Sequence, residues 1–252
     1  RRGRGPRGRL TRSAHAQRPV GHPSGGPLHV SGRAWHAAPM PAEIALTACA
    51  VPALVDWWAV ARGDQRLERW AKPATLLALL VAVALLGGVE SDAGRWLLIA
   101  LALSLAGDVA LLSDSLARFR TGLAAFLVGH LAYLVCFAAL GLPAPGWAWL
   151  VLPVLLAVVV ATRDVAPTTQ RQEGWAVSLP VAAYMLTIGA MLVVAWRTGE
   201  PLVAVGASVF VVSDAVLAVD RFVRPLRHGS LAVMITYHVG QGLVAAGVLL
   251  AV

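Results

Sequence analysis

Eight stretches of mainly apolar residues follow one another along the chain, each about as long as a helix that crosses a bilayer. Such a helix needs roughly 17–25 consecutive, mostly apolar residues. The stretches cover residues 42–61, 71–89, 96–113, 119–140, 147–162, 174–196, 202–220 and 231–251. Most links are short and contain turn-forming residues, so neighbouring helices should run antiparallel. The pattern predicts an all-α integral membrane protein, a bundle of eight transmembrane helices. A polar link of residues 163–173, which includes Pro167, joins the fifth and sixth stretches.

The composition agrees with a membrane protein. Of the 252 residues, 58% are hydrophobic and only 13% are charged, whereas a soluble domain averages roughly 25% charged residues. The two cysteines, Cys49 and Cys136, both fall in predicted helices and are not spaced as a CxxC pair. We interpret them as small packing residues without a redox or metal role.

The basic character of the chain belongs to its first 39 residues. Residues 1–39 contain eight Arg and no acidic residue, which leaves 13 Lys and Arg (21 − 8) against 13 Asp and Glu in residues 40–252. The segment has no apolar run that would make it a signal peptide, and its composition predicts disorder. A nucleic-acid-binding arm is the less favoured alternative, and we expect no nucleic-acid partner. The better interpretation is that Met40 is the true first residue and that residues 1–39 are not translated.

Positive charges in the loops predict the orientation. The first, third, fifth and seventh loops contain eleven Lys and Arg residues, and the alternate loops contain only Arg95 and Arg197. Because Lys and Arg are enriched on the cytoplasmic side, both chain ends are expected outside a bacterial plasma membrane. The Arg-rich segment would then have to cross the membrane, which is a second reason to expect that it is absent.

Asp108 and Asp214 lie deep inside the predicted third and seventh helices. A carboxylate in such a helix costs about 2.5–3.5 kcal/mol on insertion scales and usually faces a protein interior, where it has a function. Other polar side chains are expected at the same level, in the half of the membrane nearer the cytoplasm. They are Lys72, His130, Tyr133, Tyr237 and Gln241. This clustering predicts a polar cavity that contains both aspartates.

Structural alternatives exist for each of these residues. Asp108 could form a hydrogen bond with Ser104 and serve packing alone. His130 and His238 could bind a metal with the aspartates, but their spacing does not support it. Lys72 is expected to anchor its helix at the interface first and to bind a phosphate second. Asp56, near the inner end of the first helix, is expected to turn toward the interface. The tyrosines, including Tyr184, could be packing residues with a polar tip.

The aspartate-containing segments resemble one another. Gly107-Asp108, with His130 after it, echoes Ser213-Asp214, with His238 after it. The third and fourth helices would then correspond to the seventh and eighth, which keeps their orientation. One interpretation is a parallel duplication of four helices, with a site between the two halves as in many transporters.

Several motifs resemble those of the YhhN-like membrane family, which includes the lysoplasmalogenases. The matching pieces are Lys72–Thr75, Leu105–Leu112, Gly129–Tyr133, Val212–Ala218 with Arg221-Phe222, and Thr236-Tyr237 with Gln241. The likeness extends over residues 42–251 and leaves residues 1–39 without a counterpart. The chain departs from the family at His238, where members often have a tyrosine.

This resemblance implies hydrolysis of the vinyl ether bond of lysoplasmalogens, with Asp108 and Asp214 as the catalytic residues. The products would be a fatty aldehyde and glycerophosphoethanolamine or glycerophosphocholine. The reaction needs a protonated acid and an anion that stabilises an oxocarbenium ion, which two neighbouring carboxyl groups can supply. It requires no metal and no organic cofactor.

The remaining polar residues would position this chemistry. As a hypothesis, His130, Tyr133, Tyr237 and Gln241 orient the aspartates and the water, and Lys72 meets the lipid phosphate. The expected partners are a lysophospholipid substrate and membrane lipids, and the oligomeric state is open. The alternative is a proton-coupled transporter or flippase of a lipid or small solute, which buried carboxylates would also suit.

Overall fold

The computed structural model describes residues 42–113 and 115–252, and all regular elements in these residues are helical. They are α1 (Ala42–Arg62), α2 (Gln65–Val83), the π-turn η1 (Ala84–Gly88), α3 (Asp92–Leu111), α4 (Leu116–Ala139), the 3-10 turn η2 (Gly146–Leu150), α5 (Val151–Thr162), α6 (Val165–Glu173), α7 (Trp175–Arg197), α8 (Pro201–Phe222) and α9 (Gly229–Ala251). Most of the polar link 163–173 is itself helical and forms α6. The expectations for residues 1–39 and for Met40 lie outside the described residues.

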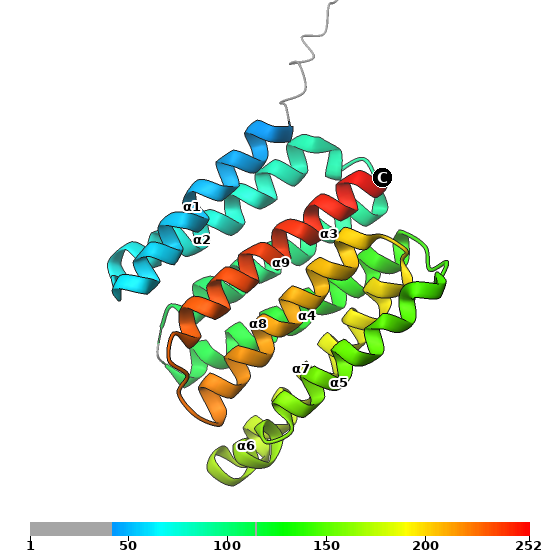
Figure 1. The fold of residues 1–252 in the computed structure, drawn as a ribbon. Helices are drawn as coiled ribbons and strands as arrows, with labels where there is room; N and C mark the ends of the chain where they lie inside the picture. The colour runs from blue at the N-terminus through cyan, green and yellow to red at the C-terminus, as the bar shows by residue number, and fades with distance from the viewer. Residues whose placement is uncertain (1–41, 114) are drawn as a thin grey trace, which may run out of the picture. The chain divides into compact units, whose positions relative to one another are not determined.

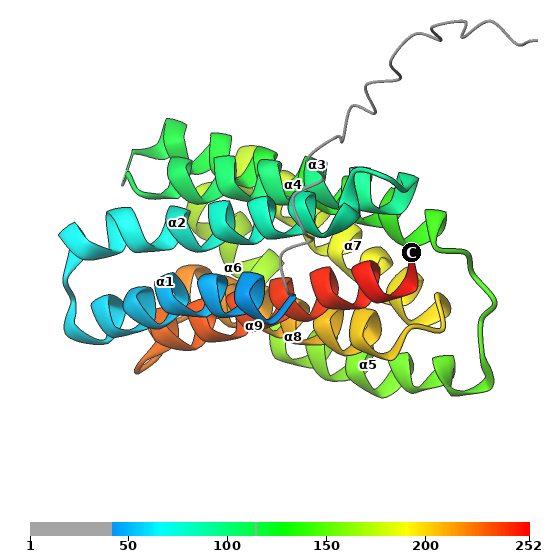
Figure 2. The ribbon, with the colours of Figure 1, turned by 90° about the horizontal axis from the view of Figure 1, so that it is seen from above.

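The long helices form two layers. Helices α1, α9, α8 and α5 lie side by side in one layer, and α2, α3, α4 and α7 form the second layer behind it (Figures 1 and 2). The most extensive contacts are made by two antiparallel pairs, α3 with α4 and α8 with α9. These are the helices that contain the two aspartates and most of the predicted polar residues.

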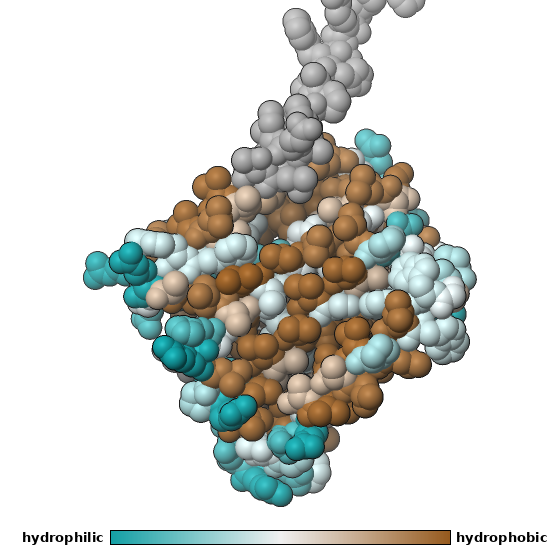
Figure 3. Space-filling model, in the orientation of Figure 1, coloured by the Kyte–Doolittle hydropathy of each residue, from teal (hydrophilic) through white to brown (hydrophobic). Residues whose placement is uncertain are grey.

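Within residues 42–113 and 115–252, seven helical segments are long and apolar enough to span a membrane: α2 with η1, α3, α4, residues 146–173, α7, α8 and α9. Figure 3 shows apolar side chains along the length of one face and hydrophilic side chains toward the two ends. Leu186 is 76% exposed and Trp149 is 73% exposed, as suits residues that face lipid. An all-helical, multi-pass membrane protein is therefore confirmed. The eighth span (α1), the duplication, the bacterial plasma membrane and the outward termini stay predictions.

Side-chain caps fix where three helices begin. The Asp64 side chain accepts hydrogen bonds from two backbone N–H groups in the first turn of α2. Ser91 caps α3 through the N–H of Gly94, and Ser115 caps α4 through the N–H of Arg118. Such caps typically contribute about 1 kcal/mol each. They set the register of α2, α3 and α4, from which Lys72, Asp108 and His130 project.

Glycines allow α8 and α9 to approach each other closely. A Cβ atom at Gly206 of α8 would lie 2.7 Å from the backbone nitrogen of Val244 in α9. A Cβ atom at Gly240 would lie 2.9 Å from the backbone nitrogen of Phe210. Small residues at such crossings are the usual means by which membrane helices pack. The glycines therefore hold the polar side chains of α8 and α9 in a fixed register.

We expect Gly206→Ala to destabilise the bundle, because the added methyl group meets helical backbone that cannot move aside locally. Overpacking of this kind costs about 1–3 kcal/mol, which should lower the midpoint of thermal unfolding in detergent. Gly242→Ala, on α9, is the matched control, because nothing lies within 4 Å of a Cβ atom there. Equal unfolding midpoints for the two variants would contradict the close packing of α8 on α9.

Candidate active site

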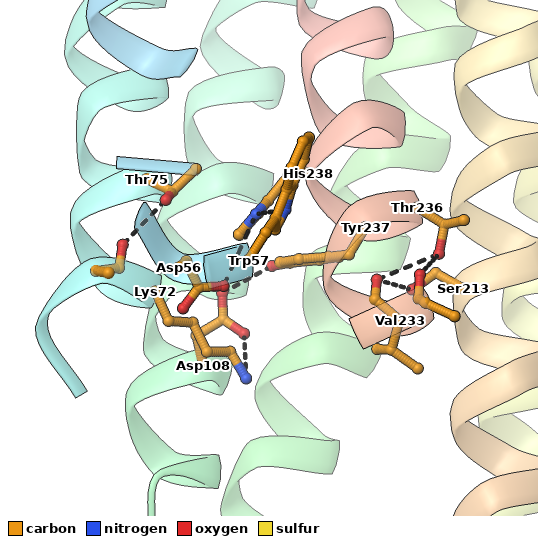
Figure 4. Close-up of polar contacts among 12 residues, drawn as sticks. Asp56, Trp57, Lys72, Thr75, Asp108, Ser213, Val233, Thr236, Tyr237 and His238 are labelled. Carbon is orange, nitrogen blue, oxygen red and sulfur yellow. Dashed lines mark hydrogen bonds and ion pairs between the residues drawn. The ribbon is translucent and has the colours of Figure 1, made fainter. Parts of the chain in front are cut away.

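Asp108 lies in the interior of the bundle and is 1% exposed. Its Oδ1 atom is 3.3 Å from Nζ of Lys72 on α2. The hydroxyl group of Tyr237, on α9, donates a 3.0 Å hydrogen bond to Oδ2 (Figure 4). Three helices thus contribute to one buried ion pair. Because each charge is partnered, Asp108 can be retained as a carboxylate despite its burial.

Lys72 does not reach the interface. Its side chain is only 9% exposed and points to Asp108, so the expectation that it anchors α2 at the membrane surface is wrong. The long, flexible stem of lysine would permit either position, but a buried carboxylate on the neighbouring α3 attracts the ammonium group inward. The predicted contact between Lys72 and a phosphate stays a prediction.

Asp214 has a different set of partners. Its side chain is 12% exposed, and its Oδ2 atom accepts a 2.6 Å hydrogen bond from the Tyr184 hydroxyl group on α7. The Nε2 atom of His130 lies 3.7 Å from the same oxygen. The Nδ1 atom of His130 is 2.6 Å from the carbonyl oxygen of Phe126. A carbonyl oxygen only accepts, so Nδ1 carries a hydrogen, and when the ring is neutral the lone pair of Nε2 faces Asp214.

Aromatic side chains lie between the two aspartate clusters. The ring of Phe210 is 5.1 Å from that of His130 and 5.4 Å from that of Tyr237, centroid to centroid. Next to them, the Tyr133 hydroxyl group donates a hydrogen bond to Oε1 of Gln241. Because Phe210 contacts both the His130 ring beside Asp214 and the Tyr237 ring beside Asp108, the clusters form one polar region. All the predicted site residues come together here, and their roles stay predictions.

A further buried group lies next to this region. Asp56 of α1 is 0% exposed, and neither of its carboxylate oxygens has a hydrogen-bond partner among the described residues. It lies 4.0 Å from Nδ1 of His238, which accepts a 3.1 Å hydrogen bond from the indole N–H of Trp57 (Figure 4). The expectation that Asp56 turns toward the interface is therefore wrong.

Metal binding finds no support in the described part of the chain. Within residues 42–113 and 115–252, no three His, Cys, Asp or Glu side chains come close enough to hold an ion. The aspartates are partnered instead by an ammonium group, phenols and an imidazole, which are groups that position and exchange protons.

A cavity of about 700 Å³ reaches the polar region from one end of the bundle. Asp214, Tyr184 and Lys72 line its inner part. Apolar residues of α4, α5, α7 and α8 form most of its walls, and charged residues lie at the end where α5 and α8 finish. The volume falls within the roughly 300–1,000 Å³ that small-molecule sites usually have. An amphiphile could therefore bring a reactive group to Asp214 while its chain stays in apolar surroundings.

A sequence model of the YhhN family matches residues 67–248. The chain belongs to the YhhN family. The predicted resemblance is thus confirmed, and the match includes every residue of the polar region. Asp56 and Trp57 lie just before it.

This YhhN chain is also similar to mammalian proteins named lysoplasmalogenase TMEM86B. It is 36% identical to the protein of Homo sapiens over 152 residues, which is 60% of this chain and 62% of the human protein. It is 34% identical to the Mus musculus protein, over 65% of this chain and 68% of the mouse protein. The aligned region thus spans about three-fifths of the length of the human relative. No solved structure matches the chain.

Two features of the site were not predicted from the sequence. The hydrogen bond from Tyr184 to Asp214 joins residues 30 positions apart on α7 and α8, and no local spacing indicates it. The burial of Asp56 depends on which face of α1 meets α9. The single available signal was chemical, since a carboxylate inside an apolar helix rarely faces lipid.

Proposed function

We propose that this chain is an intramembrane hydrolase that cleaves the vinyl ether bond of lysoplasmalogens. The products would be a fatty aldehyde and glycerophosphoethanolamine or glycerophosphocholine. The observation that carries the proposal is the placement of Asp214, a largely buried carboxyl group on the wall of an apolar cavity, in the same polar region as Asp108. The names of the mammalian relatives support the same reaction.

In the proposed reaction, a carboxyl group first donates its proton to the outer carbon of the vinyl ether double bond. The other alkene carbon and its ether oxygen then share the positive charge of an oxocarbenium ion. Water attacks that carbon and gives up a proton to the carboxylate, which restores the acid. The resulting hemiacetal collapses as its hydroxyl proton moves to the glycerol oxygen, which releases the aldehyde and the alcohol. Water is the only co-reactant.

Asp214 is the better candidate for the acid. It lines the cavity, and its neighbours are the neutral hydroxyl group of Tyr184 and the lone pair of His130 Nε2. A proton on Asp214 can therefore be delivered to an alkene bound in the cavity. The same carboxylate then faces the attacking water. Glycosidases use an acid that later acts as a base in a comparable way, by analogy only.

Asp108 would supply the negative charge that balances Lys72 beside the reacting group. Lys72 lines the cavity and, unpaired, would oppose a developing cation. Asp108, at 3.3 Å, neutralises it. A preorganised charge in a dry site stabilises a transition state more strongly than it would in water. In this proposal, Asp108 keeps Lys72 from opposing the oxocarbenium ion, and Tyr237 holds the orientation of Asp108.

The direct test is the release of fatty aldehyde from a lysoplasmalogen by the purified full-length chain in detergent. Aldehyde formation in proportion to enzyme supports the hydrolase. A protein that binds the lipid and forms no aldehyde contradicts it. The transporter alternative predicts instead that lipid or solute crosses a vesicle membrane without any cleavage.

Tyr184→Phe should lower kcat for aldehyde release by roughly two- to tenfold. The change removes one neutral hydrogen bond to Asp214, worth about 0.5–1.5 kcal/mol. The fold should be kept, because the ring still packs against His130, 5.1 Å away. Thr187→Ala is the control, since Thr187 bonds only to its own helix backbone at Ala183. An unchanged rate in the Tyr184 variant would contradict the role of this hydrogen bond.

A further inference from the structure

Two arginines lie at the charged end of the cavity. Arg163 follows the last turn of α5, and Arg221 lies in the last turn of α8. We propose that these two guanidinium groups bind the phosphate of a lysophospholipid whose single hydrocarbon chain occupies the apolar part of the cavity. The proposal rests on the proposed function for the identity of the lipid, and names the subsite that selects it.

The spacing on α8 fits such a ligand. Arg221 and Asp214 are seven residues apart, so they lie on the same face of the helix, roughly 10 Å apart along its axis. Both line the cavity, together with Ala218 between them. In a lysoplasmalogen, seven bonds separate the phosphorus atom from the alkene carbon that takes the proton, on the order of 9 Å when extended. A phosphate at Arg221 therefore brings that carbon to the level of Asp214.

The positive charge at this end is available to an anion. No salt bridge to Arg221 occurs among the described residues. Its guanidinium group lies 5.2 Å over the ring of Phe119, which holds it by a cation–π contact. The adjacent Asp220 is engaged elsewhere, because its Oδ1 atom accepts a 2.6 Å hydrogen bond from the backbone of Leu226.

Lys72 and Arg163, the other basic residues that line the cavity, differ in how strongly their charges are paired. Lys72 also lines the cavity, but Asp108 neutralises it from 3.3 Å. Arg163 is largely exposed and lies 3.7 Å from its exposed neighbour Asp164, a contact that contributes little in water. Arginine forks bind phosphate oxygens in pairs. The phosphate subsite is thus assigned to Arg163 and Arg221, rather than to Lys72.

The walls beyond the arginines suit one hydrocarbon chain. Leu155, Val158 and Val159 of α5 face the cavity, with Met185 and Leu186 of α7 opposite. Val159 is 55% exposed and Leu186 is 76% exposed, so this side of the cavity is accessible from the surface that faces lipid. A volume of about 700 Å³ favours a single-chain lipid over a two-chain phospholipid.

The proposal can be tested by binding, without any turnover. The probe is an ester lysophosphatidylcholine, which has no vinyl ether to cleave, and the comparison ligand is the monoacylglycerol with the same chain. We expect the double variant Arg163→Gln/Arg221→Gln to bind the lysophosphatidylcholine at least about tenfold more weakly, one lost charge-assisted contact being enough for this. Its affinity for the monoacylglycerol, which has no phosphate, should be unchanged.

The control is Arg197→Gln, an exposed arginine at the end of α7 away from the cavity mouth, which should leave both affinities unchanged. The variant Arg163→Lys/Arg221→Lys keeps the charges and should recover most of the binding. An equal affinity of the Gln variant and the wild type for the phosphate ligand would overturn the proposal, as would an equal loss for both ligands.

Aldehyde release by the wild type separates this proposal from the proposed function. A phosphate preference that depends on the two arginines, without any cleavage, would retain the subsite and reject the hydrolase. Cleavage without such a preference would do the reverse.

Discussion

The Asp214→Asn protein is expected to release aldehyde from lysoplasmalogen about 10²- to 10⁴-fold more slowly than the wild type. That is the range by which a positioned general acid accelerates a reaction. An asparagine amide has nearly the same shape as the carboxyl group but cannot donate a proton to an alkene carbon or accept one from water. The loss should appear in kcat, because the cavity walls that bind the chain are unchanged.

Asparagine at this position keeps an oxygen that can accept the hydrogen bond from Tyr184, so the fold should be preserved. Equal midpoints of thermal unfolding for variant and wild type would establish this. Asp92→Asn is the matched control, since Asp92 is an 82% exposed residue in the first turn of α3. A rate within about threefold of the wild type for Asp214→Asn would reject Asp214 as the general acid.

The second large effect is expected at Lys72. Lys72→Met removes the partner of a buried carboxylate and should destabilise the protein by about 3–5 kcal/mol, because Asp108 is left charged and uncompensated. The double variant Lys72→Met/Asp108→Asn replaces the ion pair by neutral groups of similar size. It should regain most of that stability, since neutral replacement of a buried pair is often tolerated.

Activity separates the roles of the two charges in this series. Asp108→Asn leaves Lys72 as an unpaired positive charge beside the oxocarbenium ion and should lack aldehyde release, whereas the double variant, which has neither charge, should regain part of it. Thermal unfolding in detergent and aldehyde release on the same preparations separate the two effects. A double variant that is both stable and fully active would show that the ion pair serves folding alone.

The long helices could be predicted from the sequence because membrane helices are recognised by long, uninterrupted apolar stretches. The helical structure within residues 163–173 was harder to predict. These residues are too polar to register as a span, yet most of them form α6, where the Thr169 hydroxyl group bonds to the carbonyl of Val165 inside the helix. The length of an apolar stretch indicates burial in lipid and does not indicate helicity. A polar helix such as α6 is therefore not recognised by this criterion.

The residues that make up the polar region could be predicted better than the contacts between them. Asp108 and Asp214 stand out because carboxylates inside apolar helices are rare. Their partners depend on which helix faces meet, and this is decided by close packing at positions such as Gly206 and Gly240. Asp56 is an example. Its position along α1 can be predicted from the sequence, but the direction in which its side chain points cannot.

The shape of the cavity has a consequence for what happens after cleavage. Its charged end and its exposed apolar side are different surfaces of one chamber. Of the two proposed products, the aldehyde would partition sideways into the bilayer, and the water-soluble glycerophospho-compound would diffuse away past the arginines. Each product would then leave for the phase in which it dissolves, and neither would block the departure of the other.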